Sequence, residues 1–261
     1  MAAICPVNII SPHRDDAAFS LALLLERLLS ASCAVRVVNC YTVSAYAPLL
    51  ATADERVVST IRAAEDELFF ASLPGQPLVA DLGRRDAPLR LERSADGVCH
   101  PLPFTQGDRE EMDAIGPEIE RAAAQGPWLL PLAIGNHIDH RLVLSGGLLT
   151  AGSRALGFYE DLPYAGRLPE ESVVSAARQV ESLLGNTLRS LVVGTGDGAL
   201  RKRALIGAYR SQLADAGMNE IEAYTRRRGG ERLWLEDELH RELAGYLRLA
   251  QSDCGVQTGG A

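Results

Sequence analysis

Short apolar runs alternate with longer amphipathic segments along the chain. The runs are rich in β-branched residues, which is typical of buried strands, whereas the amphipathic segments place their apolar residues on one face of a helix. The predicted strands span residues 7–10, 35–43, 78–82, 128–134, 157–159 and 191–193, and the predicted helices span 16–29, 52–73 (with Asp54 as N-cap), 140–151, 170–184, 200–213 and 236–249. This alternation predicts an α/β fold with a mainly parallel sheet flanked by helices.

Residues 83–107 interrupt this pattern. They are rich in Arg, Asp, Pro and Gly and have no clear periodicity. A segment of that length without secondary structure is usually either functional or disordered, so it is either a segment that covers the substrate or a plain surface excursion. The sequence contains no internal repeat, low-complexity tract or linker. We therefore expect a single domain over residues 1–251, followed by a frayed tail at 252–261.

Composition narrows the class of protein. A formal net charge of −8 and a pI near 5.2 argue against nucleic acid or an anionic membrane as partner, because both require a basic surface. No apolar run reaches the roughly 18 residues of a membrane span, and no secretion signal is recognisable. The cysteines are odd in number and scattered, which predicts neither a disulfide framework nor a cysteine-zinc site, and favours a reducing cytoplasm. They are Cys5, Cys33, Cys40, Cys99 and Cys254.

Two short segments that contain His and Asp come directly after predicted strands. Residues 11–16 follow the first strand and residues 135–140 follow the strand at 128–134. In open parallel sheets ligands bind beyond the carboxyl ends of the strands, so the two segments are expected to meet. A catalytic zinc ion uses three ligands drawn from His, Asp and Glu and keeps a fourth position for water, while a further carboxylate takes the proton of that water. The adjacent pair Asp15 and Asp16 could divide these two roles.

Each segment also has an ordinary explanation. An Asp at the start of a helix is commonly an N-cap, and a single loop histidine is commonly an exposed polar residue. The placement of both segments after strands of one sheet favours a metal site. The glycine-rich segment 194–198 lacks the phosphate-binding patterns and predicts a tight turn. A nucleotide-binding protein is disfavoured, because residues 13–16 stand where a dinucleotide site requires glycines.

With these motifs the sequence resembles the LmbE-like (PIG-L) family of metal-dependent N-deacetylases. Residues 12–16 (PHRDD) match its PHxDD motif, and residues 137–140 (HIDH) match its HxDH motif. Further family-like features are Arg62 with Glu65, residues 81–83 with Asp86, residues 159–164, Lys202 with residues 209–212, and residues 231–234. The resemblance spans about residues 7–235.

The resemblance implies a Rossmann-like fold and a role for each motif residue. His13, Asp16 and His140 would bind Zn²⁺, or another divalent ion such as Fe²⁺. Asp15 would be the general base that activates the attacking water, His137 would stabilise the oxyanion and protonate the amine, and Asp139 would tune His137. Arg62, Asp86 and Tyr159 are candidate substrate contacts.

Two positions depart from the family pattern. Arg14 stands where many members have proline, and Ala17 stands where many have glutamate. Arg14 could pair with an acidic group of the substrate or with a structural carboxylate, and we favour the structural role.

The predicted function is hydrolysis of an N-acetyl group on a small molecule, such as an amino sugar or a glycosylated natural-product or thiol precursor, with release of acetate and a free amine. The alternatives are a hydrolase of longer N-acyl or ester substrates and a non-catalytic sugar-binding relative. The sequence makes no prediction of oligomeric state.

Overall fold

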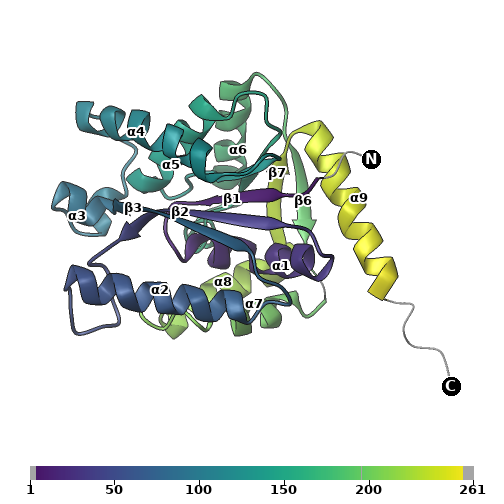
Figure 1. Cartoon of the computed structure of the whole chain (residues 1–261), viewed down its shortest axis with the longest axis horizontal. Helices are drawn as coiled ribbons and strands as arrows, with labels where there is room; N and C mark the ends of the chain where they lie inside the picture. Colours follow the sequence, from purple (N-terminus) through teal and green to yellow (C-terminus); the bar gives the residue numbers. More distant parts are fainter. Residues whose placement is uncertain (1–3, 195, 255–261) are drawn as a thin grey trace.

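A seven-stranded, mainly parallel sheet forms the centre of the molecule (Figure 1). The structure, a computed structural model, describes residues 4–194 and 196–254, with only the backbone described for residues 250–254. The strands are β1 (Val7–Ser11), β2 (Val35–Val43), β3 (Leu78–Arg85), β4 (Trp128–Pro131), β5 (Leu156–Tyr159), β6 (Arg189–Val193) and β7 (Glu231–Leu235). Their order is β3-β2-β1-β4-β5-β7-β6, and β7 is antiparallel to both of its neighbours. The predicted fold class is confirmed.

Helices cover both faces of the sheet. Figure 1 shows α4, α5 and α6 on one face, and α2, α7 and α8 on the other. The helices are α1 (Asp16–Ser30), α2 (Glu55–Ala71), α3 (Ala87–Leu91), α4 (Gln106–Ala122), α5 (Ile138–Thr150), α6 (Glu170–Leu184), α7 (Gly198–Ile206), α8 (Asp215–Arg228) and α9 (Asp237–Cys254), with 3-10 turns η1 (Asp96–Val98) and η2 (Tyr164–Arg167). Within the described residues, no helix is long and apolar enough to cross a membrane.

Most predicted elements are present, and three predictions need correction. The strand predicted over residues 128–134 ends at Pro131, because the chain then enters a loop with left-handed conformations. The helix predicted to reach residue 213 ends at Ile206, because the chain then turns to bring Tyr209 and Ser211 against α2. The segment 83–107 is not structureless, since it contains the end of β3, helix α3 and η1. Edge strand β3 extends to Arg85 and not to residue 82 as predicted, because the polar residues of its second half gave no apolar pattern. The predicted tail begins inside α9, and residues 255–261 lie outside the described residues.

A disulfide joins Cys5 to Cys33, which corrects the prediction that the chain has no disulfide framework. Cys5 precedes β1 and Cys33 precedes β2, and these strands are parallel neighbours. Their starting ends therefore lie side by side, and the two Cα atoms are 5.6 Å apart although 28 positions separate them in the sequence. The prediction of a reducing cytoplasm rested on the expected absence of a disulfide, so the structure no longer supports it.

Helix α1 is interrupted at Leu21, whose φ of −133° and ψ of 20° are not helical. The carboxylate of Glu231 accepts hydrogen bonds from the backbone N–H groups of Leu23 and Leu24, each at 2.9 Å. Lys202 Nζ lies 2.8 Å from Glu231 Oε1, and both side chains are fully buried. The pair therefore supports the helix at the point where its own hydrogen-bond ladder is broken.

Candidate metal centre and active site

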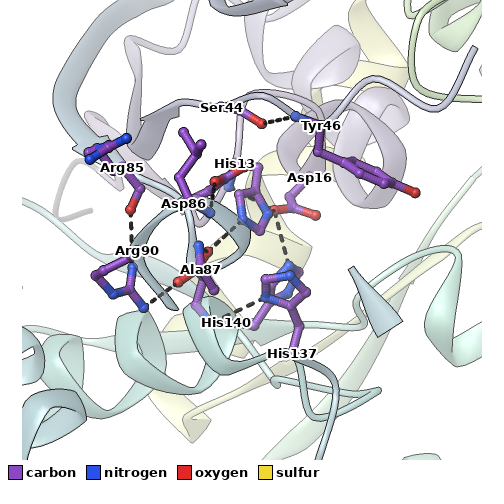
Figure 2. A network of polar contacts seen from close by, with 12 residues as sticks. His13, Asp16, Ser44, Tyr46, Arg85, Asp86, Ala87, Arg90, His137 and His140 are labelled. Atoms are coloured by element: carbon purple, nitrogen blue, oxygen red, sulfur yellow. Dashed lines mark hydrogen bonds and ion pairs between the residues drawn. The ribbon is translucent and has the colours of Figure 1, made fainter. Parts of the chain in front are cut away.

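The two motif segments meet at the point where the strand order reverses. The chain leaves β1 towards β2 and leaves β4 towards β5, so the loops after the neighbouring strands β1 and β4 diverge and open a crevice. Three histidine rings gather there, with centroids of His13 and His137 4.9 Å apart and those of His13 and His140 5.2 Å apart. Figure 2 shows these rings together with Asp16.

The loop after β1 is held by its own hydrogen bonds. Ser11 Oγ donates to the carbonyl of His13 at 2.5 Å and accepts from the N–H of Ala17 at 3.0 Å. The N–H of His13 donates to Asp16 Oδ2 at 2.8 Å. These contacts fold the segment into a compact turn that directs His13 and Asp16 to the same side.

The loop after β4 depends on left-handed backbone conformations at Ala133, Gly135 and Asn136. A Cβ atom at Gly135 would lie 2.6 Å from the ring of Tyr164, so only glycine fits beneath that ring. The N–H of Ile134 donates to Asp161 Oδ2 at 2.9 Å. The loop thereby delivers His137, the N-cap residue of α5, to the crevice.

His13, Asp16 and His140 form one candidate metal-ligand group, with one ligand atom of each within 4.8 Å of the others. His140 Nδ1 lies 2.6 Å from Asp161 Oδ1, so Nδ1 carries the proton and Nε2 presents its lone pair. Nε2 is buried and lies 3.3 Å from Asp16 Oδ2, yet it makes no hydrogen bond to any described residue. A buried nitrogen without a donor fits a metal ligand.

A second candidate group consists of His13, His137 and Asp139. The carboxylate of Asp139 is already engaged, because it accepts from the N–H of Ala87 at 2.7 Å and from Arg90 at 2.9 Å, and it lies 3.1 Å from His13 Nε2. The first group therefore fits a metal ion better.

The electric field of the centre favours a cation at His13. Burial lowers the pKa of His13, but its contacts with Asp139 and Asp16 outweigh this and raise that pKa to about 10. Burial and the neighbouring charge of His13 lower the pKa of His137 to about 3, so His137 is neutral. The centre thus combines a position suited to positive charge with a neutral imidazole beside it.

Asp15 lines a pocket of about 220 Å³ beside this centre. Its carboxylate makes no capping bond to α1 and instead accepts from Arg62 at 3.3 Å. Arg62 is buried and also donates to Ser44 Oγ at 3.1 Å. His137 and Asp86 line the same pocket. A substrate there would therefore meet Asp15 and His137 together.

Comparison with known proteins identifies the family. No family model matches the chain. It is 32% identical over 230 residues to the 2'-N-acetylparomamine deacetylase of Streptomyces fradiae, covering 87% of this chain and 80% of that protein. The chain belongs to the family of this N-deacetylase.

Solved structures of deacetylases share the fold. A deacetylase of the teicoplanin biosynthesis pathway superposes with a TM-score of 0.64 at 17% identity, covering 89% of this chain and 99% of that one. A structure described as the zinc-inhibited form of teicoplanin deacetylase gives a TM-score of 0.59 at 18% identity, over 89% and 99% of the two chains. At these identities the likeness establishes the architecture of this N-deacetylase and not its substrate.

One sequence prediction for the N-deacetylase site needs correction. Tyr159 is fully buried, and its hydroxyl donates to the carbonyl of Ile10 at 2.9 Å, so it cannot contact substrate. Tyr164 lines the pocket instead. Asp139 was expected to tune His137, and its charge does raise the pKa of His137 against the effect of burial. Its carboxylate contacts His13, and its backbone N–H donates to His137 Nδ1 at 3.2 Å.

The structure also places the residues whose roles were open or were not predicted. Arg14 pairs with Asp81 at 2.6 Å and with Asp66 at 3.5 Å, which supports the structural role for its charge. The contact of Asp161 with His140 was missed. Its signal was available, because Asp161 follows strand β5 as the two motifs follow β1 and β4.

Proposed function

We propose that this N-deacetylase is an LmbE-like (PIG-L) enzyme that uses a divalent metal ion, which we propose to be Zn²⁺, to hydrolyse the acetamide of an amino sugar. The observation that carries the proposal is that the group His13, Asp16 and His140 adjoins a pocket lined by Asp15 and His137. The relative from Streptomyces fradiae is named for 2'-N-acetylparomamine, which supports an aminoglycoside-type substrate.

His13, Asp16 and His140 would hold the metal. A divalent ion there supplies Lewis-acid chemistry, lowering the pKa of a water molecule towards 7 and polarising the amide carbonyl. Asp15 takes the proton of the attacking water, and Arg62, 3.3 Å away, orients that carboxylate.

His137 acts on the oxyanion and not on the attacking water. Its Nδ1 accepts the N–H of Asp139, so in the neutral ring the proton is on Nε2. A neutral ring with a pKa near 3 is suited to donate a hydrogen bond to the oxyanion. Asp15, protonated in the first step, is then the group that can pass a proton to the departing amine. This refines the expected role of His137, with oxyanion stabilisation ahead of proton donation.

The proposal is tested with purified enzyme, metal analysis and an acetate-release assay on N-acetylated amino sugars. Asp15→Asn and His137→Ala are each expected to retain metal and to lose activity by roughly 10²-fold or more. Asp113→Asn, on the exposed side of α4, is the matched control and should keep full activity. Full activity in either site variant with metal retained would contradict the assigned roles.

The same assay separates the alternatives. A pocket of about 220 Å³ favours acetyl over a long acyl chain, so kcat/KM is expected to fall along a series from acetyl to octanoyl. A rise along that series would favour the hydrolase of longer acyl groups. Full metal occupancy and sugar binding without any acetate release would favour the non-catalytic sugar-binding relative.

A further inference from the structure

Four carboxylates line the pocket beside the metal centre, and three of them have partners within the protein. These are Asp15 with Arg62, Asp16 with His13, and Asp86, which accepts the N–H of Leu89 as the N-cap of α3. The fourth is Asp96 in η1, which is exposed and whose carboxylate makes no hydrogen bond or ion pair with any residue that the structure describes. Its charge is therefore available to a ligand.

The two arginines of the lining are engaged by other carboxylates. Arg62 is paired with Asp15, and Arg167 lies 2.8 Å from Glu220 outside the pocket. The carboxylate of Asp96 is therefore a charge of the lining that neither arginine compensates, in a chain with a net charge of −8. Such a field attracts cationic ligands and repels anionic ones.

Tyr46 presents an aromatic ring at the same mouth. The residue is 42% exposed, although its backbone is fixed by three hydrogen bonds. Its N–H donates to Ser44 Oγ at 3.0 Å (Figure 2), and its carbonyl accepts from Arg62 at 3.4 Å and from Gln212 at 3.3 Å. Tyr46 and Asp96 line the same pocket. Burial and then the charge of Asp96 raise the pKa of the Tyr46 hydroxyl.

A carboxylate beside an aromatic face is suited to an ammonium group. The carboxylate supplies a charged hydrogen-bond acceptor, and the ring attracts the cation through its quadrupole. We infer that Asp96 and Tyr46 form an ammonium subsite that selects amino sugars bearing a second, free amine in addition to the acetylated one. This inference rests on the proposed function and specifies the class of substrate for it.

The size of the pocket supports this division. Sites for drug-sized ligands usually enclose about 300–1,000 Å³, whereas this pocket encloses about 220 Å³. The part of a substrate larger than this volume would therefore extend to the mouth, where the exposed residues Asp96 and Tyr46 lie.

The test compares two substrates of different charge. One is 2'-N-acetylparomamine, which carries free amines, and the other is uncharged N-acetylglucosamine. Asp96→Asn is expected to raise KM for the first substrate about tenfold, to leave its kcat within twofold, and to change neither constant for the second. Tyr46→Leu should also raise KM for the amine-bearing substrate, whereas Tyr46→Phe keeps the ring and should not. In 0.5 M NaCl the difference between wild type and Asp96→Asn should shrink.

Failure of this inference is distinguishable from failure of the proposed function. Equal effects of Asp96→Asn on both substrates, or no effect on either, would overturn the ammonium subsite while acetate release still supported the deacetylase. If metal-loaded wild type releases acetate from neither substrate, the ammonium subsite is still tested by calorimetry with paromamine. Asp96→Asn must then weaken the affinity for paromamine about tenfold. Asp113→Asn is the control for loss of one negative charge.

Discussion

The buried pair of Lys202 and Glu231 offers a sharp test of how the chain supports its active-site helix. Replacing Glu231 by glutamine leaves the ammonium group of Lys202 buried without a charged partner. The substitution also replaces by an amide the carboxylate that accepts hydrogen bonds from the backbone N–H groups of Leu23 and Leu24. Glutamine keeps a single acceptor oxygen, so one of the two N–H groups loses its partner.

The expected loss follows from these contacts. Breaking a fully buried ion pair by removing one partner costs about 3–5 kcal/mol, because an uncompensated charge is left in the interior. For a domain of this size about 1 kcal/mol corresponds to roughly 2–4 °C in Tm, so Glu231→Gln should lower Tm by roughly 6–20 °C. Burial lowers the pKa of Lys202 and raises the pKa of Glu231, so neutralisation of the remaining partner will soften the loss.

The assay is urea unfolding followed by circular dichroism, with the metal load held constant. Glu55→Gln is the matched control, because Glu55 lies 2.8 Å from Arg85, the same distance as in the buried pair, but both side chains are exposed. That control should cost less than about 1 kcal/mol. The double variant Lys202→Met/Glu231→Gln should lose less than the sum of the single variants. A cost for Glu231→Gln no larger than for Glu55→Gln would refute the reasoning.

Three further predictions concern the site and its surroundings. Asp161→Asn should weaken metal binding about 10–100-fold, because it removes the carboxylate that orients His140; unchanged metal affinity in a chelator competition would contradict this. Gly135→Ala should raise KM and lower Tm, since its Cβ would meet the ring of Tyr164 at 2.6 Å; wild-type values of both would show that the loop tolerates a side chain. Burial raises the pKa of Asp66 from 3.8 to about 7, so the stability that its protonated form contributes is present below pH 4 and is lost as pH rises through 7. Between pH 5 and 8 the free energy of unfolding in urea should therefore fall less for Asp66→Asn than for wild type. Equal falls would contradict that pKa.

The part of the site that the sequence predicted lies at strand ends. Both motifs follow apolar runs that are buried on both faces. The first strand ends one residue later than predicted, and the strand predicted over residues 128–134 ends at Pro131. Because ligands bind beyond the carboxyl ends of parallel strands, the sequence predicts that residues 11–16 and 135–140 meet. Helix α6 and strand β2 match their predicted bounds.

The elements that sequence reasoning missed are those whose buried positions are polar or few. Helix α4 buries Ile115 and Ile119 but contains Pro117, and its signal was the capping box of Thr105 with Asp108. Strand β7 alternates correctly, but its first buried residue is Glu231, whose partner Lys202 is remote in sequence. Such a charge resembles a surface residue until its partner is known.

The remaining errors concern contacts between elements. Tyr159 and Tyr164 are both near the end of β5, and only the packing shows that the first is enclosed by the sheet while the second faces the pocket. The pairing of Cys5 with Cys33 likewise depends on β1 and β2 being parallel neighbours in register. Pattern and spacing along one chain carry no direct signal for either.

The choice between two metal-ligand groups that share His13 depends on where positive charge already stands. Asp139 lies 2.9 Å from the guanidinium of Arg90, so a divalent ion bound to Asp139 would be close to a permanent cation and would meet strong repulsion in a buried environment. Asp16 has histidine neighbours only, and a histidine can release its proton when a metal binds. Arg90 therefore separates two otherwise similar carboxylates. It holds Asp139 as a partner that orients His13 and leaves Asp16 as the carboxylate free to bind the metal, which is why the HxDH segment supplies His140 and not its aspartate to the proposed centre.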